Sequence, residues 1–175
     1  MKSWRRNSMS VGKLIIIRGN SGSGDATVAR ELRYSGYMQQ ATSPYALEQV
    51  IGALRQSWSY ETTFDHPGWS EQNPARGHCI VSSLIMQDYF GGDLRRYQVA
   101  GRGIAERHYV NVLDGGVVVD TTASQYQIPI TLTVLPFELD GFSSIREKRL
   151  SDDETRGRYE LLSERVAHIL GSSKV

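Results

Sequence analysis

The chain has 175 residues, a length that suits one domain with a substantial hydrophobic core. Hydrophobic residues make up 39% and charged residues 22%, which is ordinary for a soluble globular protein. The 20 basic and 19 acidic residues leave a formal net charge of +1, so the overall charge favours neither nucleic acid nor an anionic membrane as a partner. A single cysteine excludes an internal disulfide and fits a reducing compartment, and we interpret the protein as cytoplasmic.

The first part of the chain, residues 1–43, differs in character from the rest. Its only apolar run, Leu14 to Ile17, is too short for a signal-peptide core or a membrane span. This division predicts a folded domain over 44–171 and a short tail over 172–175. Within the first part we predict a basic tail over 1–12, a short buried strand over 13–18, a glycine-rich loop over 19–24, a short helix over 25–33 and a linker.

The glycine-rich loop at 19–24 resembles the Walker A motif of P-loop nucleotide kinases. Asp25 and Ala26 stand where that motif has lysine and a serine or threonine. A carboxylate in place of the cation repels phosphate by roughly a few kcal/mol at an effective dielectric of about 20. We therefore interpret 13–33 as a vestigial, degenerate P-loop-like segment, and nucleotide binding is the weakest of the functional hypotheses.

The remaining elements follow from hydrophobic periodicity and stop signals. An ordered loop is expected over 57–76, Gly91 and Gly92 are expected to end a helix, and Ser151 and Glu154 have the spacing of a capping box. Helices are predicted over 45–56, 78–90 and about 152–170, the last with Tyr159, Leu162, Val166 and Ile169 inward, and strands over 95–100, 107–113, 116–121 and 130–135. Helices, then an antiparallel meander, then a closing helix predict an α+β fold.

Cys79, the single cysteine, stands at the predicted beginning of a helix. The unpaired amides and the helix dipole at such a position favour the reactive thiolate. The alternative is a free cysteine that is buried as a small hydrophobe. His108 on one strand and Asp120 at the end of the next would supply the base and the orienting group that a thiol nucleophile needs.

The hairpin between these two strands decides whether His108 and Asp120 share a face of the sheet. A three-residue turn over 114–116 pairs Leu113 with Val117 and puts the two side chains on the same face. A two-residue turn would put Asp120 on the opposite face. The triad therefore predicts a turn of odd length that has a glycine in the left-handed region.

An oxyanion hole would need hydrogen-bond donors near the thiolate. The backbone amide of Cys79 is the first candidate, and the side chains of Asn73 and His78 are the next. Three aromatic residues are candidates for lining a substrate groove, with core packing as the alternative for at least two of them: Trp58, Trp69 and Tyr109.

A zinc site that combines Cys79 with His66, His78 or His108 is the competing chemistry. The sequence disfavours it, because there is one thiol and no CxxC or HxxxH spacing. We therefore expect neither a metal nor a cofactor.

The segments around these positions resemble the YunG-type proteins of bacteria. The shared segments are the approach to the cysteine over 73–79, the helix end over 87–92, the strand over 108–111 and the strand end over 119–126. The resemblance covers about residues 45–170. It implies a compact α+β fold like those of the papain and transglutaminase families, in which a helix carrying the cysteine packs on an antiparallel sheet.

The same resemblance implies that Cys79, His108 and Asp120 occupy matching places. His78 stands where the family usually has glutamine, which weakens the case for an oxyanion role of that side chain. The leading hypothesis is a cysteine-dependent amide hydrolase or acyl-transfer enzyme that acts on a peptide or small amide. The alternative is a non-catalytic binding or interaction module on the same fold, and the oligomeric state stays open.

Overall fold

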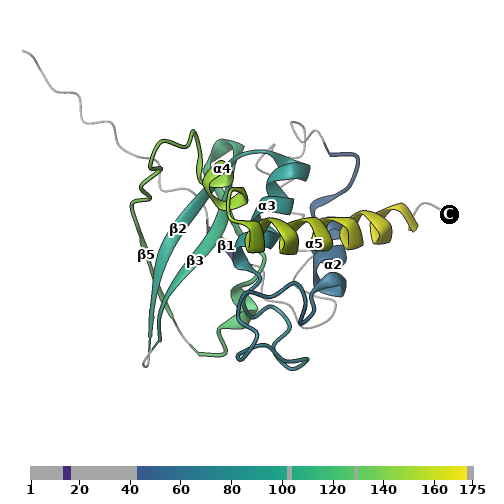
Figure 1. Ribbon diagram of the computed structural model, residues 1–175, viewed down its shortest axis with the longest axis horizontal. Helices are drawn as coiled ribbons and strands as arrows, with labels where there is room; N and C mark the ends of the chain where they lie inside the picture. The colour runs from purple at the N-terminus through teal and green to yellow at the C-terminus, as the bar shows by residue number, and fades with distance from the viewer. Residues whose placement is uncertain (1–13, 17–42, 102–103, 129, 173–175) are drawn as a thin grey trace, which may run out of the picture.

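A computed structural model describes residues 14–16, 43–101, 104–128 and 130–172 of the chain. These residues form an α+β fold in which helices gather on one side of a five-stranded sheet (Figure 1). No helix in this described part is long and apolar enough to cross a bilayer. The strands are β1 (Leu14–Ile16), β2 (Asp93–Gly101), β3 (Ile104–Leu113), β4 (Val117–Asp120) and β5 (Thr131–Val134), and the helices are α2 (Leu47–Ser57), α3 (Cys79–Phe90), α4 (Ile145–Leu150) and α5 (Asp153–Ser172).

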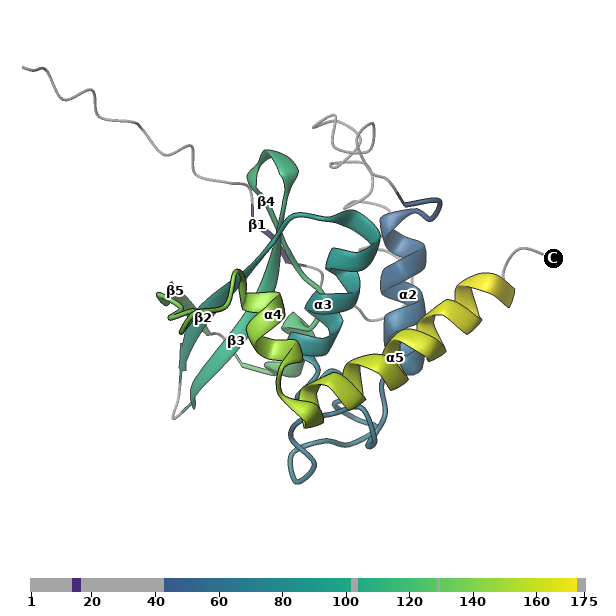
Figure 2. The ribbon, with the colours of Figure 1, turned by 45° about the horizontal axis from the view of Figure 1, so that its top comes forward.

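Helix α3 is the centre of the molecule and lies between β3 on one side and α2 and α5 on the other (Figure 2). Most of α3 is buried, from Ile80 to Met86 and at Phe90, so it needs neighbouring elements on more than one side. Two hydrogen bonds fix its position on β3: Asn111 Nδ2 donates to the Ser83 carbonyl at 2.8 Å, and Ser83 Oγ donates to the Tyr109 carbonyl at 3.3 Å. Cys79 lies one turn before Ser83, so these bonds also set its place over the sheet.

The predicted helices over 45–56, 78–90 and about 152–170 are present as α2, α3 and α5. Helix α3 ends at Gly91, which has φ 67° and donates its N–H to the Gln87 carbonyl at 2.9 Å, as the stop signal predicts. On α5 the residues with the least exposure are Leu162, Val166 and Leu170, while the predicted Tyr159 and Ile169 are half-buried beside them.

The predicted capping box of Ser151 and Glu154 is wrong. Asp152 caps α5, because its Oδ1 accepts the N–H of Thr155 at 2.8 Å. Ser151 instead ends α4, where its N–H donates to the Glu147 carbonyl at 3.0 Å. The short helix α4 has no fully buried residue, so it has no hydrophobic periodicity by which the sequence could have shown it.

The sheet order β1-β4-β3-β2-β5 corrects the predicted meander. Strands β2, β3 and β4 are consecutive and antiparallel, but β5 pairs with β2 at the far edge instead of with β4. The other side of β4 is taken by β1, which runs parallel to it with Ile16 opposite Asp120 (Figure 2). Of the strand predicted over 13–18, the described residues 14–16 are part of the sheet. The basic tail, the glycine-rich loop, the helix over 25–33 and the linker up to residue 42 lie outside the described residues.

The turn between β3 and β4 has the odd length that the triad requires. Leu113 pairs with Val117 and Asn111 with Val119, so three residues form the turn. Gly115 and Gly116 both have φ 78°, in the left-handed region. This register confirms the prediction that His108 and Asp120 share one face of the sheet.

Two adjacent glycines after α3 provide a matched test of the packing between this helix end and β3. Gly91 and Gly92 have φ 67° and 75°, but a Cβ on Gly92 would lie 2.4 Å from the Val112 carbonyl oxygen, whereas a Cβ on Gly91 would meet open space. We expect Gly91→Ala to cost about 1 kcal/mol of unfolding free energy and Gly92→Ala about 2–4 kcal/mol, as measured by urea denaturation. Equal losses in the two variants would show that Val112 moves aside without cost.

Candidate active site

The two strand residues of the predicted triad form a buried hydrogen-bonded pair. Nε2 of His108 lies 2.8 Å from Oδ2 of Asp120, and the side chains are 0% and 2% exposed. The second carboxylate oxygen of Asp120 accepts the N–H of Thr122 at 3.0 Å. A buried carboxylate is tolerated only when its oxygens have such partners, so the strand end is built around this group.

Cys79 joins this pair from the first turn of α3. Its side chain interacts electrostatically with the imidazole of His108, whose Nε2 is bound to Asp120 and whose Nδ1 lies 3.2 Å from Nε2 of Gln125. The register of the two strands would put Thr122 opposite His108, but β4 has already ended at Asp120. The pairing of β3 with β4 therefore stops short of His108.

The electrostatics of the pair favour a protonated imidazole. Burial lowers the pKa of His108, but the carboxylate of Asp120 and the interaction with Cys79 outweigh it and raise the pKa to about 10. A histidine that holds its proton beside a thiol stabilises the thiolate. In this arrangement Asp120 fixes a protonated imidazole beside Cys79.

Gln125 and Tyr126, which follow β4, also contact the ring of His108. Neither residue was assigned a role from the sequence. Nε2 of Gln125 lies 3.2 Å from Nδ1 of His108, and the ring of Tyr126 meets the imidazole edge-on at 5.3 Å. Nδ1 of a protonated imidazole is a donor, so Gln125 would then accept through Oε1 after rotating its amide. The only sequence signal for both residues is their place directly after Asp120 in the segment over 119–126.

The structure does not bring the side chain of His78 to the thiol. It is fully buried, with Nε2 2.8 Å from the Thr62 hydroxyl and Nδ1 3.0 Å from the Arg76 carbonyl. Burial lowers its pKa to about 4, so this imidazole is neutral and serves the loop that precedes α3. Position 78, where the resemblance implies glutamine and this chain has histidine, therefore lies in the core beneath the site.

The other candidates divide between the loop, the core and the cavity. Asn73 Nδ2 donates to the Gln125 carbonyl at 3.1 Å, which ties the loop to the strand end. Trp69 Nε1 donates to the Pro74 carbonyl at 3.2 Å, and Trp58 is buried with its Nε1 donating to Ser82. Among the candidate aromatic residues, Tyr109 is the one that lines the cavity beside Cys79.

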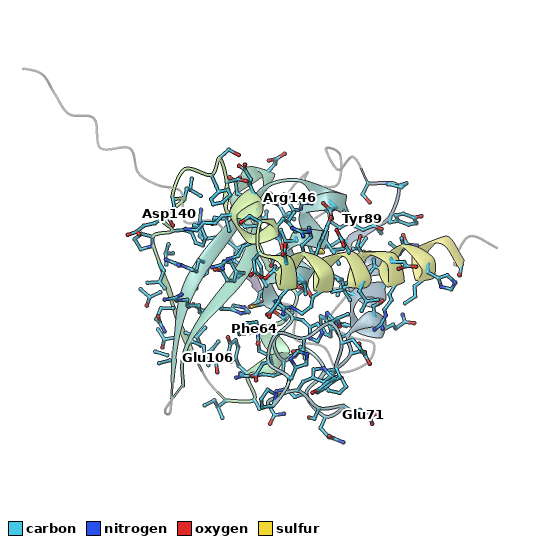
Figure 3. The ribbon with its side chains drawn as sticks, in the orientation of Figure 1. Phe64, Glu71, Tyr89, Glu106, Asp140 and Arg146 are labelled. Carbon is cyan, nitrogen blue, oxygen red and sulfur yellow. The ribbon has the colours of Figure 1, made fainter. Side chains whose placement is uncertain are left out.

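This cavity has a volume of about 450 Å³ and opens beside Cys79 between β3, the loop before α3, and the beginning of α5. Figure 3 labels Phe64 and Glu106, two of the residues that line it. Arg76 closes one wall, since its guanidinium contacts Asp65 at 2.5 Å and both carboxylate oxygens of Glu106 at 2.8 and 3.0 Å. A cavity of this size can hold a small molecule or a few atoms of a peptide.

The zinc alternative finds no support in the part of the chain that the structure describes. No group of three or more histidine, cysteine, aspartate or glutamate side chains within these residues has the geometry to hold a metal ion. His78, one of the proposed ligands, makes its two ring contacts with Thr62 and the Arg76 backbone instead.

Fold and site together define an α+β protein that has a cysteine at a helix N-terminus beside a buried histidine–aspartate pair. Comparison with known proteins gives the family: the model of the YunG protein family matches residues 46–171, and the chain belongs to this family. It is 36% identical over 90 residues to the uncharacterized protein YunG of Bacillus subtilis (strain 168), an alignment that covers 51% of this chain and 71% of the relative. No solved structure matches the chain.

The buried neutral His78 makes stability depend on pH. Its folded-state pKa of about 4 lies below the unfolded value of about 6.5, so its contribution is complete above pH 6.5 and is lost as the pH falls toward 4. We expect His78→Gln, which installs the residue usual in the family, to remove about 2 kcal/mol of the loss in unfolding free energy between pH 7 and pH 5. Urea denaturation at several pH values measures this difference.

The control for this experiment is His168→Gln, which removes an exposed histidine of α5. Its stability curve against pH should follow that of the wild type. Parallel curves for the wild type and His78→Gln would contradict the assignment of this pH dependence to His78.

Proposed function

We propose that the protein is a cysteine-dependent amide hydrolase or acyl-transfer enzyme with a fold like those of the papain and transglutaminase families. The observation that carries the proposal is one imidazole, that of His108, which is hydrogen-bonded to a buried Asp120 and whose pKa is raised by Asp120 and also by Cys79, a residue that lines an open cavity. A nucleophile, a base and an orienting group in this relation are what thiol catalysis requires.

In this reaction the thiolate sulfur of Cys79 attacks the carbonyl carbon of an amide and forms a C–S bond. The C–N bond then breaks, and His108 gives its proton to the leaving amine. Water or an amine, deprotonated by His108, attacks the resulting thioester, and the C–S bond breaks to release the acyl group and the thiolate. With water the overall reaction is hydrolysis of the amide, and with an amine it is acyl transfer.

Charge that develops on the carbonyl oxygen needs a donor close to the sulfur. Cys79 is the first residue of α3, so its own amide has no acceptor within the helix and is free to serve. The side chains of Asn73 and His78, which the sequence also suggests, are hydrogen-bonded elsewhere. The backbone amide is therefore the donor in this proposal.

The reactivity of Cys79 toward iodoacetamide tests the proposal. Paired with His108, the thiol should be alkylated rapidly at pH 6–7, far below the ordinary thiol pKa of about 8.5. His108→Ala should lower the rate at pH 6.5 by about tenfold or more, and Asp120→Asn should lower it less, because it removes the orienting group and leaves the base. Intact-protein mass spectrometry gives the rates, since Cys79 is the single cysteine.

His66→Ala is the matched control, because His66 is exposed in the loop before α3 and does not line the cavity. Its alkylation profile should match that of the wild type. A rate that rises only near pH 8.5 in the wild type and in His108→Ala alike would reject catalysis by this pair and favour the alternative, a non-catalytic binding module.

A further inference from the structure

The cavity beside Cys79 holds more positive than negative charge. Four arginines line it, Arg76, Arg107, Arg149 and Arg158, against two carboxylates, those of Asp65 and Glu106. Both of these carboxylates contact Arg76. The other three guanidinium groups therefore have no carboxylate of the cavity wall bound to them, and two of these groups are held in place by the fold.

The guanidinium of Arg149, from α4, is placed by aromatic rings. Its Cζ lies 5.1 Å from the ring centre of Tyr109 and 5.2 Å from that of Phe137, and Nη2 donates to the Tyr109 hydroxyl. Within the described residues Arg149 has no ion pair, and its buried Nε has no hydrogen-bond partner. A guanidinium fixed over rings without a counterion is unusual for a structural arginine.

Arg158, from the first turns of α5, lies in the same wall with similar surroundings. Its side chain is 11% exposed, its Cζ lies 5.4 Å over the ring of Phe64, and its buried Nε also lacks a partner. The carboxylate within ion-pair range is that of Glu154, 3.9 Å away and 83% exposed. Burial lowers the pKa of Arg158 below its ordinary range, so its charge is only weakly compensated by the protein.

Asp152 is a further acidic group that interacts electrostatically with the guanidinium groups of Arg149 and Arg158. The hydrogen bonds from Thr155 lower the pKa of Asp152 most, and the charges of Arg158 and Arg149 add to that effect. Asp152 is exposed at the end of α4 and is already bound to the N-terminus of α5, where it acts as the cap. It does not line the cavity, so it leaves the inner edges of the two arginines available to a ligand.

We propose that this cavity binds a substrate that carries a carboxylate, and that Arg149 and Arg158 bind that carboxylate while the group to be attacked lies at Cys79. The substrate class is thus an acidic amide or peptide, and that part rests on the function proposed above. Guanidinium groups suit this role because their planar N–H donors match the two oxygens of a carboxylate. Their rigid setting over aromatic rings keeps the cost of ordering them low.

A pair of reagents of nearly equal size tests the carboxylate site separately from the reactivity of Cys79. Iodoacetate and iodoacetamide alkylate the same thiol, but the first carries a carboxylate and the second a neutral amide. We expect the ratio of the iodoacetate rate to the iodoacetamide rate to be about threefold or more higher at Cys79 than for free N-acetylcysteinamide, because the arginines attract the anion. The ratio cancels any change in the fraction of thiolate, which affects both reagents alike.

Substitutions then assign the effect to residues. Arg149→Gln and Arg158→Gln should each lower this ratio, and the double variant should bring it to the value of the free thiol. Arg149→Lys, which keeps the charge, should retain most of it. The control is Arg156→Gln, which removes an arginine two positions from Arg158 that pairs with Asp153 and does not line the cavity. Its ratio should equal that of the wild type.

A ratio at Cys79 equal to that of the free thiol, or a ratio unchanged in the double variant, would overturn the carboxylate site. A thiol that neither reagent can reach would overturn it too, because the cavity would then exclude a carboxylate of that size. Failure of the catalytic proposal is visible separately, as slow alkylation by both reagents below pH 8, and the ratio can still be measured at pH 9.

Discussion

The hydrogen bond between His108 and Asp120 is the interaction on which the site around Cys79 depends. Both side chains are almost completely buried, and removing either would leave a polar group without a partner in the core. The bond also fixes the orientation of the ring, because Nε2 is held by the carboxylate and Nδ1 lies next to Gln125. A three-residue turn with two left-handed glycines is what puts both residues on one face of the sheet.

The second constraint is the docking of α3 on β3, which is held by side-chain contacts to backbone carbonyls. Asn111 and Ser83 link the two elements, while His78, buried under the first turn, links the helix to the loop that lines the cavity. Thus one set of polar contacts positions Cys79 and a separate set positions the wall of the cavity. The loop arginine Arg76 joins that wall to β3 through Glu106, so one side of the cavity is built from close ion pairs. On the other side, Arg158 has only a long contact of 3.9 Å to the exposed Glu154, and the buried Nε atoms of Arg149 and Arg158 have no partner.

Many of the helices and turns follow from local patterns in the sequence. Leu47, Val50, Ile51 and Leu54 recur at helical spacing and are all buried on α2, and the glycines after α3 and β3 take the positive φ values that turns require. Features without such a local pattern could not be predicted from the sequence. Helix α4 has no buried stripe, and Asp152 instead of Ser151 caps α5. Strand β5 pairs with β2 at the far edge, whereas β1 pairs with β4. Pairing of distant strands is not encoded in the spacing of either strand.

The sequence by itself determined which residues are the candidates for the site and the parity of the turn between His108 and Asp120, because alternation along a strand and the conformational freedom of glycine are local properties. Tertiary structure alone decided what surrounds them. It buried His78 away from the cavity, brought Gln125 and Tyr126 to His108, and placed Arg149 and Arg158 from α4 and α5 in the wall beside Cys79. These contacts join residues up to about 80 positions apart, and their cause is the packing of α3 and α5 around one core, which no short stretch of sequence contains.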